Sequence, residues 1–250
     1  MELGIDGRVA LVTGASKGIG LGIATALAAE GARVGVSSRS RERIDAAAQL
    51  IGARPFVHDS GDVDGAPALV DAVEAELGPV DILVVNSGGP PVGADPLGFT
   101  RVQWEAAYRE LVLTPMALIE RVVPGMRQRG WGRVVNVSST AVREPIPGIM
   151  LSNTHRSATL AAFKTLARHL AGDGITLNTL LTGRIATDRL LETSGGSREE
   201  VAAAAAADVP AGRLGTVEEY ADVAAFLCSD RAAYLTGAAL PIDGGLLHGI

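Results

Sequence analysis

Hydrophobic residues occur along this chain in short runs that alternate with longer segments of helical periodicity. A run such as VDILVVN at 80–86 is almost continuously apolar, which is typical of a strand covered on both faces. Strands that alternate with helices predict an α/β fold, a doubly wound parallel sheet of seven strands in a single domain. The strands are expected at 9–12, 32–38, 54–58, 80–86, 133–139, 175–181 and 238–243. Helices are expected after the first strand and at 41–51, 64–77, 101–129, 151–171 and 216–229.

Two stretches depart from this regular pattern. Pro115 and Pro124 fall within the helix expected at 101–129, where we expect them to bend or end parts of it. Residues 182–212 are polar and mixed, apart from an alanine run at 202–207 that predicts one mobile helix. We expect residues 184–212 to form a mobile lid over a substrate.

The first strand leads directly into a glycine-rich turn. The sequence RVALVTGASKGIGLG at 8–22 predicts a buried strand, a tight turn and a helix N-terminus. Gly14 permits a turn that a side chain would forbid, and Gly18 and Gly20 let the backbone approach a diphosphate and pack closely against the sheet. The N–H groups and the positive end of the helix can then hold this anion. The alternative is a turn that binds nothing, but its place on the first strand favours nucleotide binding.

Composition and charge exclude several classes of partner. The chain of 250 residues is 47% hydrophobic with few aromatic residues, so aliphatic side chains must fill one large core. The net charge is −6 and no basic run stands out, which argues against nucleic acid and anionic membrane surfaces as partners. Cys228 is the only cysteine, which excludes an internal disulfide and predicts a buried, inert thiol. Because no signal-peptide pattern or membrane-spanning run is present, we expect a cytoplasmic protein.

Four segments, in one order, resemble motifs of the short-chain dehydrogenase/reductase family. TGASKGIG at 13–20 resembles its cofactor glycine motif, and VDILVVNSGG at 80–89 resembles its Asn-Ala-Gly motif, with Ser87 in place of alanine. RVVNVSS at 133–139 resembles the strand that ends in the catalytic serine, and residues 210–245 resemble the C-terminal signature. The resemblance covers nearly the whole chain. It implies a Rossmann-type fold, an NAD(P)-dependent oxidoreductase, and assembly as a homotetramer or homodimer.

The residues after the second strand favour NADP(H) as the cofactor. An acidic residue at this position would bind the 2′-hydroxyl of the adenosine ribose and repel a 2′-phosphate. The chain has Ser38 and Arg39 instead, with Lys17 in the glycine loop, and an arginine can contact a phosphate bidentately. The alternative is that Arg39 and Lys17 are solvated surface charges.

The resemblance completes the expected cofactor site. It implies that residues 59–60 contact the adenine, that 86–88 line the ribose, and that Thr187 contacts the nicotinamide amide. The Pro-Gly that precedes this threonine in the family is Thr182-Gly183 here. The expected cofactor-binding residues are Gly14, Ser16, Lys17, Gly18, Ile19, Gly20, Ser38, Arg39, Asp59, Ser60, Asn86, Ser87, Gly88 and Thr187.

The catalytic residues implied by the resemblance are only partly present. The family uses a serine, a tyrosine, a lysine four residues later, and an asparagine on the long central helix. Ser139 matches the serine, but Ser152 occupies the tyrosine position and Arg156 the lysine position. Leu111 stands where the asparagine is expected. The chain is therefore identified as a divergent member that lacks the Tyr-x-x-x-Lys pair, with Ser139, Ser152 and Arg156 as candidate catalytic residues.

Ser152 and Arg156 lie one helical turn apart and are expected to face the same cleft. Arginine stays protonated, so it cannot relay a proton, but it can stabilise an oxyanion, a ribose or a substrate carboxylate. The serine hydroxyl is far less acidic than a phenol, so the proton must come from His155, Tyr108, water or the substrate. We expect His155 to point elsewhere, about 100° round the helix, and Tyr108 to be a packing residue.

The remaining histidines and aromatic residues add no further site. His58, His169 and His248 lack a partner pattern, so no metal site is expected. Trp104 and Trp131 are expected to pack. The turn NSGGPP at 86–91 either shapes a substrate pocket or is a plain loop.

These features lead to one main functional hypothesis and two rivals. The main hypothesis is an NADP(H)-dependent oxidoreductase that reduces a small carbonyl substrate, with 3-oxoacyl thioesters suggested by the resemblance. The first rival is a catalytically silent nucleotide-binding sensor or assembly subunit, and the second is a lyase or isomerase on the same scaffold. For assembly, Ala158, Ala161 and Ala162 would allow close helix–helix contact between subunits, or would serve internal packing.

Overall fold

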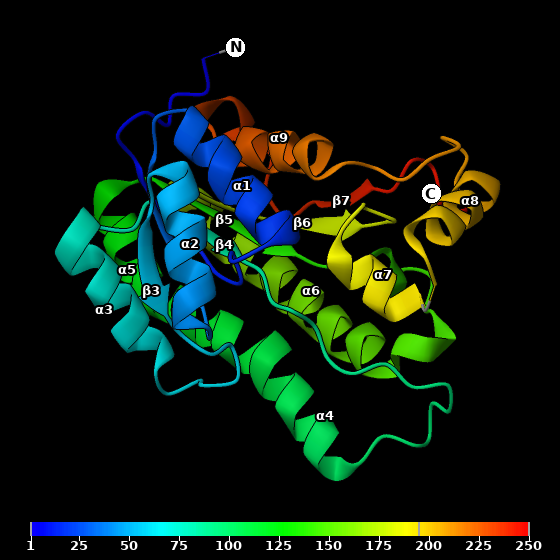
Figure 1. Cartoon of the computed structure of the whole chain (residues 1–250). Coiled ribbons are helices and arrows are strands. Elements are labelled where there is room, and N and C mark those ends of the chain that lie inside the picture. The colour runs from blue at the N-terminus through cyan, green and yellow to red at the C-terminus, as the bar shows by residue number, and fades with distance from the viewer. Residues whose placement is uncertain (1, 195, 250) are drawn as a thin grey trace.

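The computed structural model describes residues 2–194 and 196–249, and a parallel sheet runs through its centre (Figure 1). The seven strands follow the order β3-β2-β1-β4-β5-β6-β7, and all neighbouring pairs are parallel. The predicted doubly wound, Rossmann-type sheet is therefore confirmed. The strands are β1 (Val9–Val12), β2 (Arg33–Ser38), β3 (Arg54–Val57), β4 (Ile82–Val85), β5 (Gly132–Val137), β6 (Ile175–Thr182) and β7 (Ala239–Ile242).

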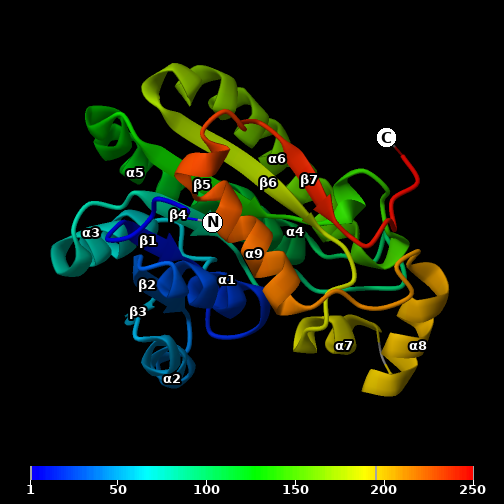
Figure 2. The ribbon, with the colours of Figure 1, turned by 90° about the horizontal axis from the view of Figure 1, so that it is seen from above.

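Helices cover both faces of the sheet (Figures 1 and 2). Residues of β1 and β4 are buried at every position, which explains why their sequences are continuously apolar. Leu27 and Tyr220 belong to the core on one face, and Leu118 and Phe163 to the core on the other. The first face carries α1 (Gly18–Ala29), α2 (Arg41–Ile51) and α9 (Val217–Leu227). The second face carries α3 (Ala66–Leu77), α5 (Thr114–Arg129) and α6 (Met150–Leu170).

The strand order reverses between β1 and β4, and this reversal fixes where a ligand can bind. β1 pairs with β2 on one side and with β4 on the other. The chain that leaves β1 turns to the face of α1, whereas the chain that leaves β4 continues toward the helices of the opposite face. A crevice therefore opens between the two connections, at the carboxyl ends of the strands.

The long helix predicted at 101–129 is continuous, but its winding changes halfway. α4 (Arg101–Tyr108) leads into a π-helical turn, Arg109–Leu113, and then into α5. At this turn the backbone carbonyl of Leu111 accepts a hydrogen bond from the hydroxyl of Thr159 on α6. A π turn widens the helix and releases a carbonyl from the regular pattern, and here a neighbouring helix supplies the missing donor.

Neither of the two prolines of this region ends the helical path. Pro115 lies directly after the π turn, inside the continuous helical path, so its missing N–H leaves one carbonyl of the preceding turn without a helical donor. Pro124 lies inside α5, which continues to Arg129, so it does not end the helix.

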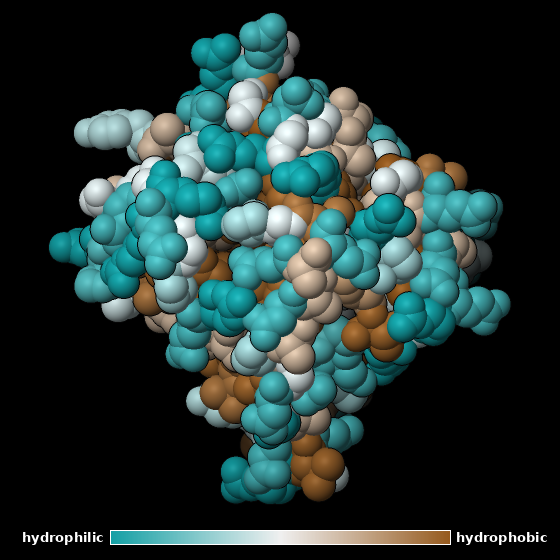
Figure 3. Space-filling model, turned by 90° about the vertical axis from the view of Figure 1, so that its left-hand side faces the viewer, coloured by the Kyte–Doolittle hydropathy of each residue, from teal (hydrophilic) through white to brown (hydrophobic). Residues whose placement is uncertain are grey.

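The mixed segment predicted at 182–212 contains two helices. α7 (Asp188–Ser194) and α8 (Arg198–Asp208) lie side by side, and α8 includes the alanine run (Figure 2). None of the helices among residues 2–194 and 196–249 is long and apolar enough to cross a membrane. The face shown in Figure 3 is largely hydrophilic, and its hydrophobic residues form small separate groups.

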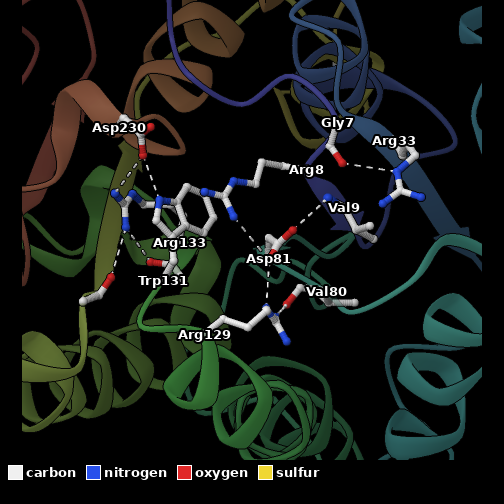
Figure 4. Close-up of polar contacts among 12 residues, drawn as sticks. Gly7, Arg8, Val9, Arg33, Val80, Asp81, Arg129, Trp131, Arg133 and Asp230 are labelled. Atoms are coloured by element: carbon white, nitrogen blue, oxygen red, sulfur yellow. Dashed lines mark hydrogen bonds and ion pairs between the residues drawn. The ribbon is translucent and has the colours of Figure 1, made fainter.

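A polar network closes the amino ends of the central strands, opposite the crevice (Figure 4). The carboxylate of Asp81 accepts hydrogen bonds from the Val9 backbone N–H (3.2 Å) and from Arg129 Nε (3.1 Å). The ring of Trp131 lies between two guanidinium groups, with that of Arg8 3.9 Å and that of Arg133 4.4 Å from its centroid. Trp131 was expected only to pack, and it also donates its indole N–H to a carboxylate, that of Asp230 (2.8 Å). These contacts hold the starts of β1, β4 and β5 together, away from the ligand-binding end.

Candidate active site

A cavity of about 1340 Å³, called the cleft below, lies at the carboxyl ends of β1, β2, β4, β5 and β6. Pockets for a single drug-sized ligand have volumes of roughly 300–1,000 Å³, so the cleft has room for a dinucleotide and a second small molecule. Every residue that the sequence placed in the cofactor and catalytic sites lines this one cavity. These residues are Gly14, Ser16, Lys17, Gly18, Ile19, Gly20, Ser38, Arg39, Asp59, Ser60, Asn86, Ser87, Gly88, Ser139, Ser152, Arg156 and Thr187.

The glycines after β1 have two different structural roles. Gly14 and Gly18 both adopt a φ of +58°, a left-handed conformation that side chains disfavour. Gly20 has an ordinary φ, but a Cβ there would lie 2.5 Å from the carbonyl oxygen of Gly14. Gly18 was expected to allow close packing, whereas a Cβ at Gly18 would meet only Thr187, at 3.6 Å. Its backbone conformation is therefore the reason for glycine at this position.

Asn86 ties the chain after β4 to the glycine turn. Its side-chain amide donates hydrogen bonds to the carbonyl oxygens of Thr13 (3.3 Å) and Gly14 (2.9 Å). The Thr13 hydroxyl in turn donates to the Asn86 carbonyl at 2.8 Å. Asn86 therefore fixes the shape of the cleft floor, a supporting role that its expected contact with ribose did not include.

Two serine hydroxyls in the cleft wall suit a polar ligand. The Oγ atoms of Ser87 and Ser138 are buried and have no hydrogen-bond partner among the described residues. Buried hydroxyls in folded proteins are nearly always paired, so an unpaired hydroxyl at a cavity wall indicates a ligand group. Together with the glycine turn, they fit a dinucleotide laid across the strand ends.

The cationic residues divide between two regions of the cleft. Arg39 and Arg43 line it next to Ser38, at the end of β2. Lys17, which the sequence placed beside them, instead contacts α7, where its Nζ lies 3.6 Å from Asp188 and 3.4 Å from Glu192. The positive charge of these residues suits a phosphate. Arg39 and Arg43 lie at the end of β2, whereas Lys17 contacts the acidic residues of α7.

Ser139, Ser152 and Arg156 form the polar group at the end of β5. Ser139 follows this strand and its hydroxyl oxygen accepts the Ala141 backbone N–H at 3.1 Å. The hydroxyl oxygen of Ser152 accepts Arg156 Nε at 3.1 Å, and Arg156 Nη1 donates to the Val137 carbonyl at 2.6 Å. Since each serine oxygen already accepts a hydrogen bond from the protein, its own O–H remains to donate into the cleft.

No tyrosine occupies the cleft. The chain has three tyrosines, and all of them lie in the described part of the structure outside the cavity lining. Tyr220 is fully buried, its hydroxyl lies 2.8 Å from that of Thr182, and burial raises its pKa well above the usual range. Tyr234 is fully exposed. A phenol therefore cannot replace the missing catalytic tyrosine here.

The two proton-donor candidates on neighbouring helices also point away from the cleft. His155 is buried, its Nδ1 lies 2.7 Å from the carbonyl of Leu151, and its ring packs 5.3 Å from that of Trp104. The ring of Tyr108 lies 6.1 Å from that of His155. Both residues therefore join α4 to α6, which agrees with the expectations that His155 points elsewhere and that Tyr108 packs.

Two cleft residues had no motif that could identify them. Glu110 lines the cleft from the π turn, and Arg189 lines it from α7. Sequence motifs did not identify Glu110 and Arg189 because they come from two separate elements. Gly89 lies in the turn at 86–91, and both Arg156 and Arg189 reach toward it. This turn therefore shapes the cleft rather than forming a plain loop.

Thiol and metal chemistry have little support in the described chain. Cys228 is buried in the core against α9, and burial raises the pKa of its thiol to about 12. The Cys228 thiol is therefore protonated and inert near neutral pH. Within residues 2–194 and 196–249, no group of three or more His, Cys, Asp or Glu residues is arranged to hold a metal ion.

Comparisons with known proteins match this geometry. The family model described as enoyl-(acyl carrier protein) reductase matches residues 14–247. The chain is 34% identical over 248 residues to 3-oxoacyl-[acyl-carrier-protein] reductase FabG of Escherichia coli, covering 98% of this chain and 99% of that protein. It is 33% identical over 251 residues to acetoacetyl-CoA reductase of Cupriavidus necator, with coverage of 97% and 99%.

A solved structure extends the likeness to the fold. L-Sorbose reductase from Gluconobacter frateurii, whose crystal structure is complexed with NADPH and L-sorbose, matches with a TM-score of 0.94 at 32% identity. The match covers 100% of both chains. The family model, the relatives and the fold agree with the motifs of the sequence, and the chain belongs to the short-chain dehydrogenase/reductase family.

Proposed function

We propose that this protein is an NADP(H)-dependent oxidoreductase that reduces a small carbonyl substrate at an atypical Ser139, Ser152 and Arg156 site. The observation that carries the proposal is the single cleft, in which these three side chains and the glycine turn meet. The E. coli and C. necator relatives are named as 3-oxoacyl and acetoacetyl-CoA reductases, and the L-sorbose reductase structure contains NADPH. These names favour a ketone or 3-oxoacyl substrate.

The residues that line the cleft support the following arrangement of the nucleotide. The N-terminus of α1 and the backbone of Gly14 to Gly20 would hold the diphosphate, because the first N–H groups of a helix have no partner within the helix. Arg39 would bind the 2′-phosphate beside Ser38, with Arg43 close to it. Asp59 and Ser60 would contact the adenine, Ser87 and Gly88 the ribose, and Thr187 the nicotinamide amide. When bound, NADPH would supply the hydride.

The protein's own chemistry at the carbonyl would be stabilisation of negative charge. Arg156 holds the Ser152 oxygen through Nε, so the Ser152 O–H is oriented as a donor to the substrate oxygen. Ser139 is fixed in the same way by the Ala141 N–H. Two fixed hydroxyls beside a guanidinium would stabilise the oxyanion that develops as the carbonyl is reduced.

The proton for that oxyanion would come from water or from the substrate, because the cleft contains no phenol. Loss of general-acid catalysis costs about two to four orders of magnitude in rate. We therefore expect slow turnover, or a substrate whose carbonyl is already activated.

A silent nucleotide-binding protein is the main rival, and the missing tyrosine and lysine favour it. Replacing Ser139 by Ala separates the two accounts, because a silent binder loses no measurable activity. A lyase or isomerase would instead turn over its substrate without added nucleotide. Retention of two fixed hydroxyls and a cation in the cleft favours the reductase.

We also propose that the described part of residues 184–212 is a lid. Its first helix is attached to both sides of the cleft, by Lys17 to Glu192 at 3.4 Å and by Arg189 to the carbonyl of Pro90 at 2.7 Å. Both are polar contacts between side chains or loops at the cleft, so they can break without exposing core residues. Slower hydrogen exchange of α7 after NADPH addition supports the lid, and unchanged exchange argues against it.

Assembly as a homotetramer or homodimer is proposed through α6. Ala158 and Ala161 are exposed on this helix, and Ala161 lines a shallow apolar groove with Leu160 and Gly237. Small side chains allow helices of two subunits to approach closely. A monomeric sedimentation profile at micromolar concentration would contradict this assembly.

The proposed function predicts a specific effect of Arg39→Ala on nucleotide binding. The wild type should bind NADPH about 100-fold more tightly than NADH, because one charge-assisted phosphate contact contributes about 1.5–3 kcal/mol. Arg39→Ala should remove most of this preference without weakening NADH binding. Calorimetric titration measures both affinities. Arg41→Ala is the matched control, since Arg41 pairs with Asp45 on the surface of α2 at 3.6 Å. Equal affinities in the wild type, or no binding of either nucleotide, would contradict the proposal.

A further inference from the structure

Two arginines from different helices converge on one glycine at the substrate end of the cleft. Gly89 has a φ of +79°, and a Cβ at this residue would lie 3.7 Å from Nη2 of Arg156 and 3.7 Å from Nη2 of Arg189. Apart from the chain neighbours of Gly89, no other described atom lies within 4 Å of that point. Glycine therefore leaves a small gap between two guanidinium groups, and any side chain would fill it.

Each guanidinium is held toward the gap by a contact of its own. Arg156 is fixed by the Ser152 oxygen (3.1 Å) and the Val137 carbonyl (2.6 Å), both of which are neutral acceptors. Arg189 Nη2 donates to the Pro90 carbonyl at 2.7 Å, directly after Gly89 in the chain. Both side chains are thus positioned before any ligand arrives, which reduces the side-chain entropy that the protein loses on binding.

The electrostatics of Arg156 are unusual for an arginine. No carboxylate of the described residues lies within the 4.0 Å ion-pair distance of Arg156, although the residue is half-buried. Burial lowers its pKa, and the nearby charge of Arg189 also lowers it, whereas Glu110 acts in the opposite direction. A buried cation is costly unless an anion compensates it. A bound anion between the two arginines would offset the free-energy cost of burying Arg156 and the repulsion between the two positive charges.

The other charged groups of this region do not fill that role. Asp188 and Glu192 on α7 are within 4 Å of Lys17, and Glu192 is 4.0 Å from Arg189 in an exposed pair. Glu110 lines the cleft from the π turn and forms no ion pair with Arg156 in the described chain. Within the described residues, the atoms that face the gap at Gly89 thus belong to the two guanidinium groups and to no carboxylate.

We propose that Arg156 and Arg189 bind a carboxylate of the substrate, so that the preferred substrates are oxo acids rather than neutral ketones. This inference rests on the proposed reductase function. A planar guanidinium donates parallel hydrogen bonds to a carboxylate, and two of them can share its two oxygens. Because Arg156 also orients the Ser152 hydroxyl, the carboxylate would be bound beside the donors that receive the carbonyl oxygen. Carbonyl and carboxylate are therefore expected to be close together in the substrate.

Paired acids and esters test the inference directly. Pyruvate, acetoacetate and levulinate place a ketone at increasing distances from a carboxylate, and their methyl esters lack the charge. With the wild type, kcat/KM should be at least 10-fold higher for one or more acids than for the matching ester. Arg189→Met should lower kcat/KM for that acid by about 10- to 100-fold, the range of one lost charge-assisted hydrogen bond, and should leave the ester within about twofold.

Two further variants make the result specific. Arg189→Lys retains the charge but not the planar fork, so it should keep part of the preference for the acid. Arg127→Met is the control, because Arg127 lies outside the cleft lining and is paired with Asp173 at 2.7 Å. This variant should leave kcat/KM unchanged for both the acid and the ester. Calorimetric titration of NADPH into each variant checks that cofactor binding is unaltered.

The possible outcomes separate this inference from the proposed function. If the esters have the same kcat/KM as the matching acids, the inference is wrong, while the proposed reductase function stands. If Arg189→Met weakens NADPH binding but keeps the acid-to-ester ratio, the arginines bind the cofactor diphosphate, and the inference is wrong. Titration of the acids into the protein with NADP⁺ gives a readout without turnover. Binding of an acid that depends on Arg189, without any reduction, would support the carboxylate site and contradict the proposed function.

Discussion

At the scale of single residues, the altered catalytic positions remain a connected pair. Ser152 and Arg156 replace the residues that the family uses, yet Arg156 still bonds across one helical turn to Ser152. The pair also reaches the end of β5, through the Val137 carbonyl. A side chain that merely filled space would not need these contacts. The substitution therefore exchanges a proton donor for a fixed hydroxyl and a permanent positive charge.

This arrangement predicts the effect of replacing Ser152 by Ala. Loss of one oriented donor to a developing oxyanion costs about 10²–10³ in kcat, whereas NADPH affinity should stay within about twofold. Ser157→Ala is the control, since this hydroxyl lies further along α6 and bonds to the Asn153 carbonyl at 2.7 Å. Steady-state kinetics with the preferred carbonyl compound measures the loss. A Ser152→Ala protein with wild-type kcat would show that the hydroxyl takes no part in the reaction.

Residues identified by local motifs could be predicted, and residues brought together by folding could not. The glycine turn, Asn86 and Ser139 were recognisable because each has a fixed place beside a strand end. Arg189 is an ordinary arginine in a polar segment, and only the fold carries it to Gly89. Asn86 was found by its motif, but its amide bonds to the glycine turn follow from the β1–β4 pairing.

At the scale of elements, the start of α9 is held by a compact charged cap. Thr216 and Glu219 form a capping box, and Arg213 donates to both carboxylate oxygens of Glu219, at 2.9 and 2.6 Å. These bonds lower the pKa of Glu219 to about 2, and the hydrogen bond from Arg213 makes the largest contribution. Val217 in the same turn packs against Gly22 of α1, the helix that begins at the glycine turn.

The cap predicts a pH-dependent contribution to stability. The ionised Glu219 is favoured in the folded state, so its contribution is complete above about pH 4.5 and is lost as the pH falls toward about 2. Glu219→Gln should therefore lower the thermal midpoint at pH 7 but have little effect near pH 2. Glu218→Gln, in the same helical turn, is the control. Thermal unfolding by circular dichroism gives the comparison, and an equal loss at both pH values would contradict the assignment.

The π turn is a feature of the long helix that hydrophobic periodicity does not predict. Hydrophobic periodicity predicts one helix over 101–129, and the structure confirms a continuous helical path. The extra residue in the turn is accommodated because the Thr159 hydroxyl bonds to the Leu111 carbonyl. That contact joins residues far apart in the sequence. Local pattern therefore predicts the helix but not its change of winding.

At the scale of the whole molecule, stability and chemistry occupy opposite ends of the sheet. The network around Asp81 and Trp131 closes the amino ends of the strands (Figure 4). The cleft opens at the carboxyl ends, where strands β1 and β4 lead into glycine-rich turns. A rigid base allows the other end to hold a large, polar cavity. The sequence placed the site motifs directly after strands, at the carboxyl ends, whereas it did not predict the network at the amino ends.

The central claim is that the cleft transfers a hydride despite lacking a tyrosine. The most direct measurement uses NADPH carrying deuterium at the transferable position of the nicotinamide, with the panel of oxo acids and esters and enzyme at near-stoichiometric concentration. Mass spectrometry of the products then follows the label. We predict deuterium on the former carbonyl carbon of at least one product. Tight binding of NADPH with no label in any product would contradict the account and identify the chain as a silent nucleotide-binding protein.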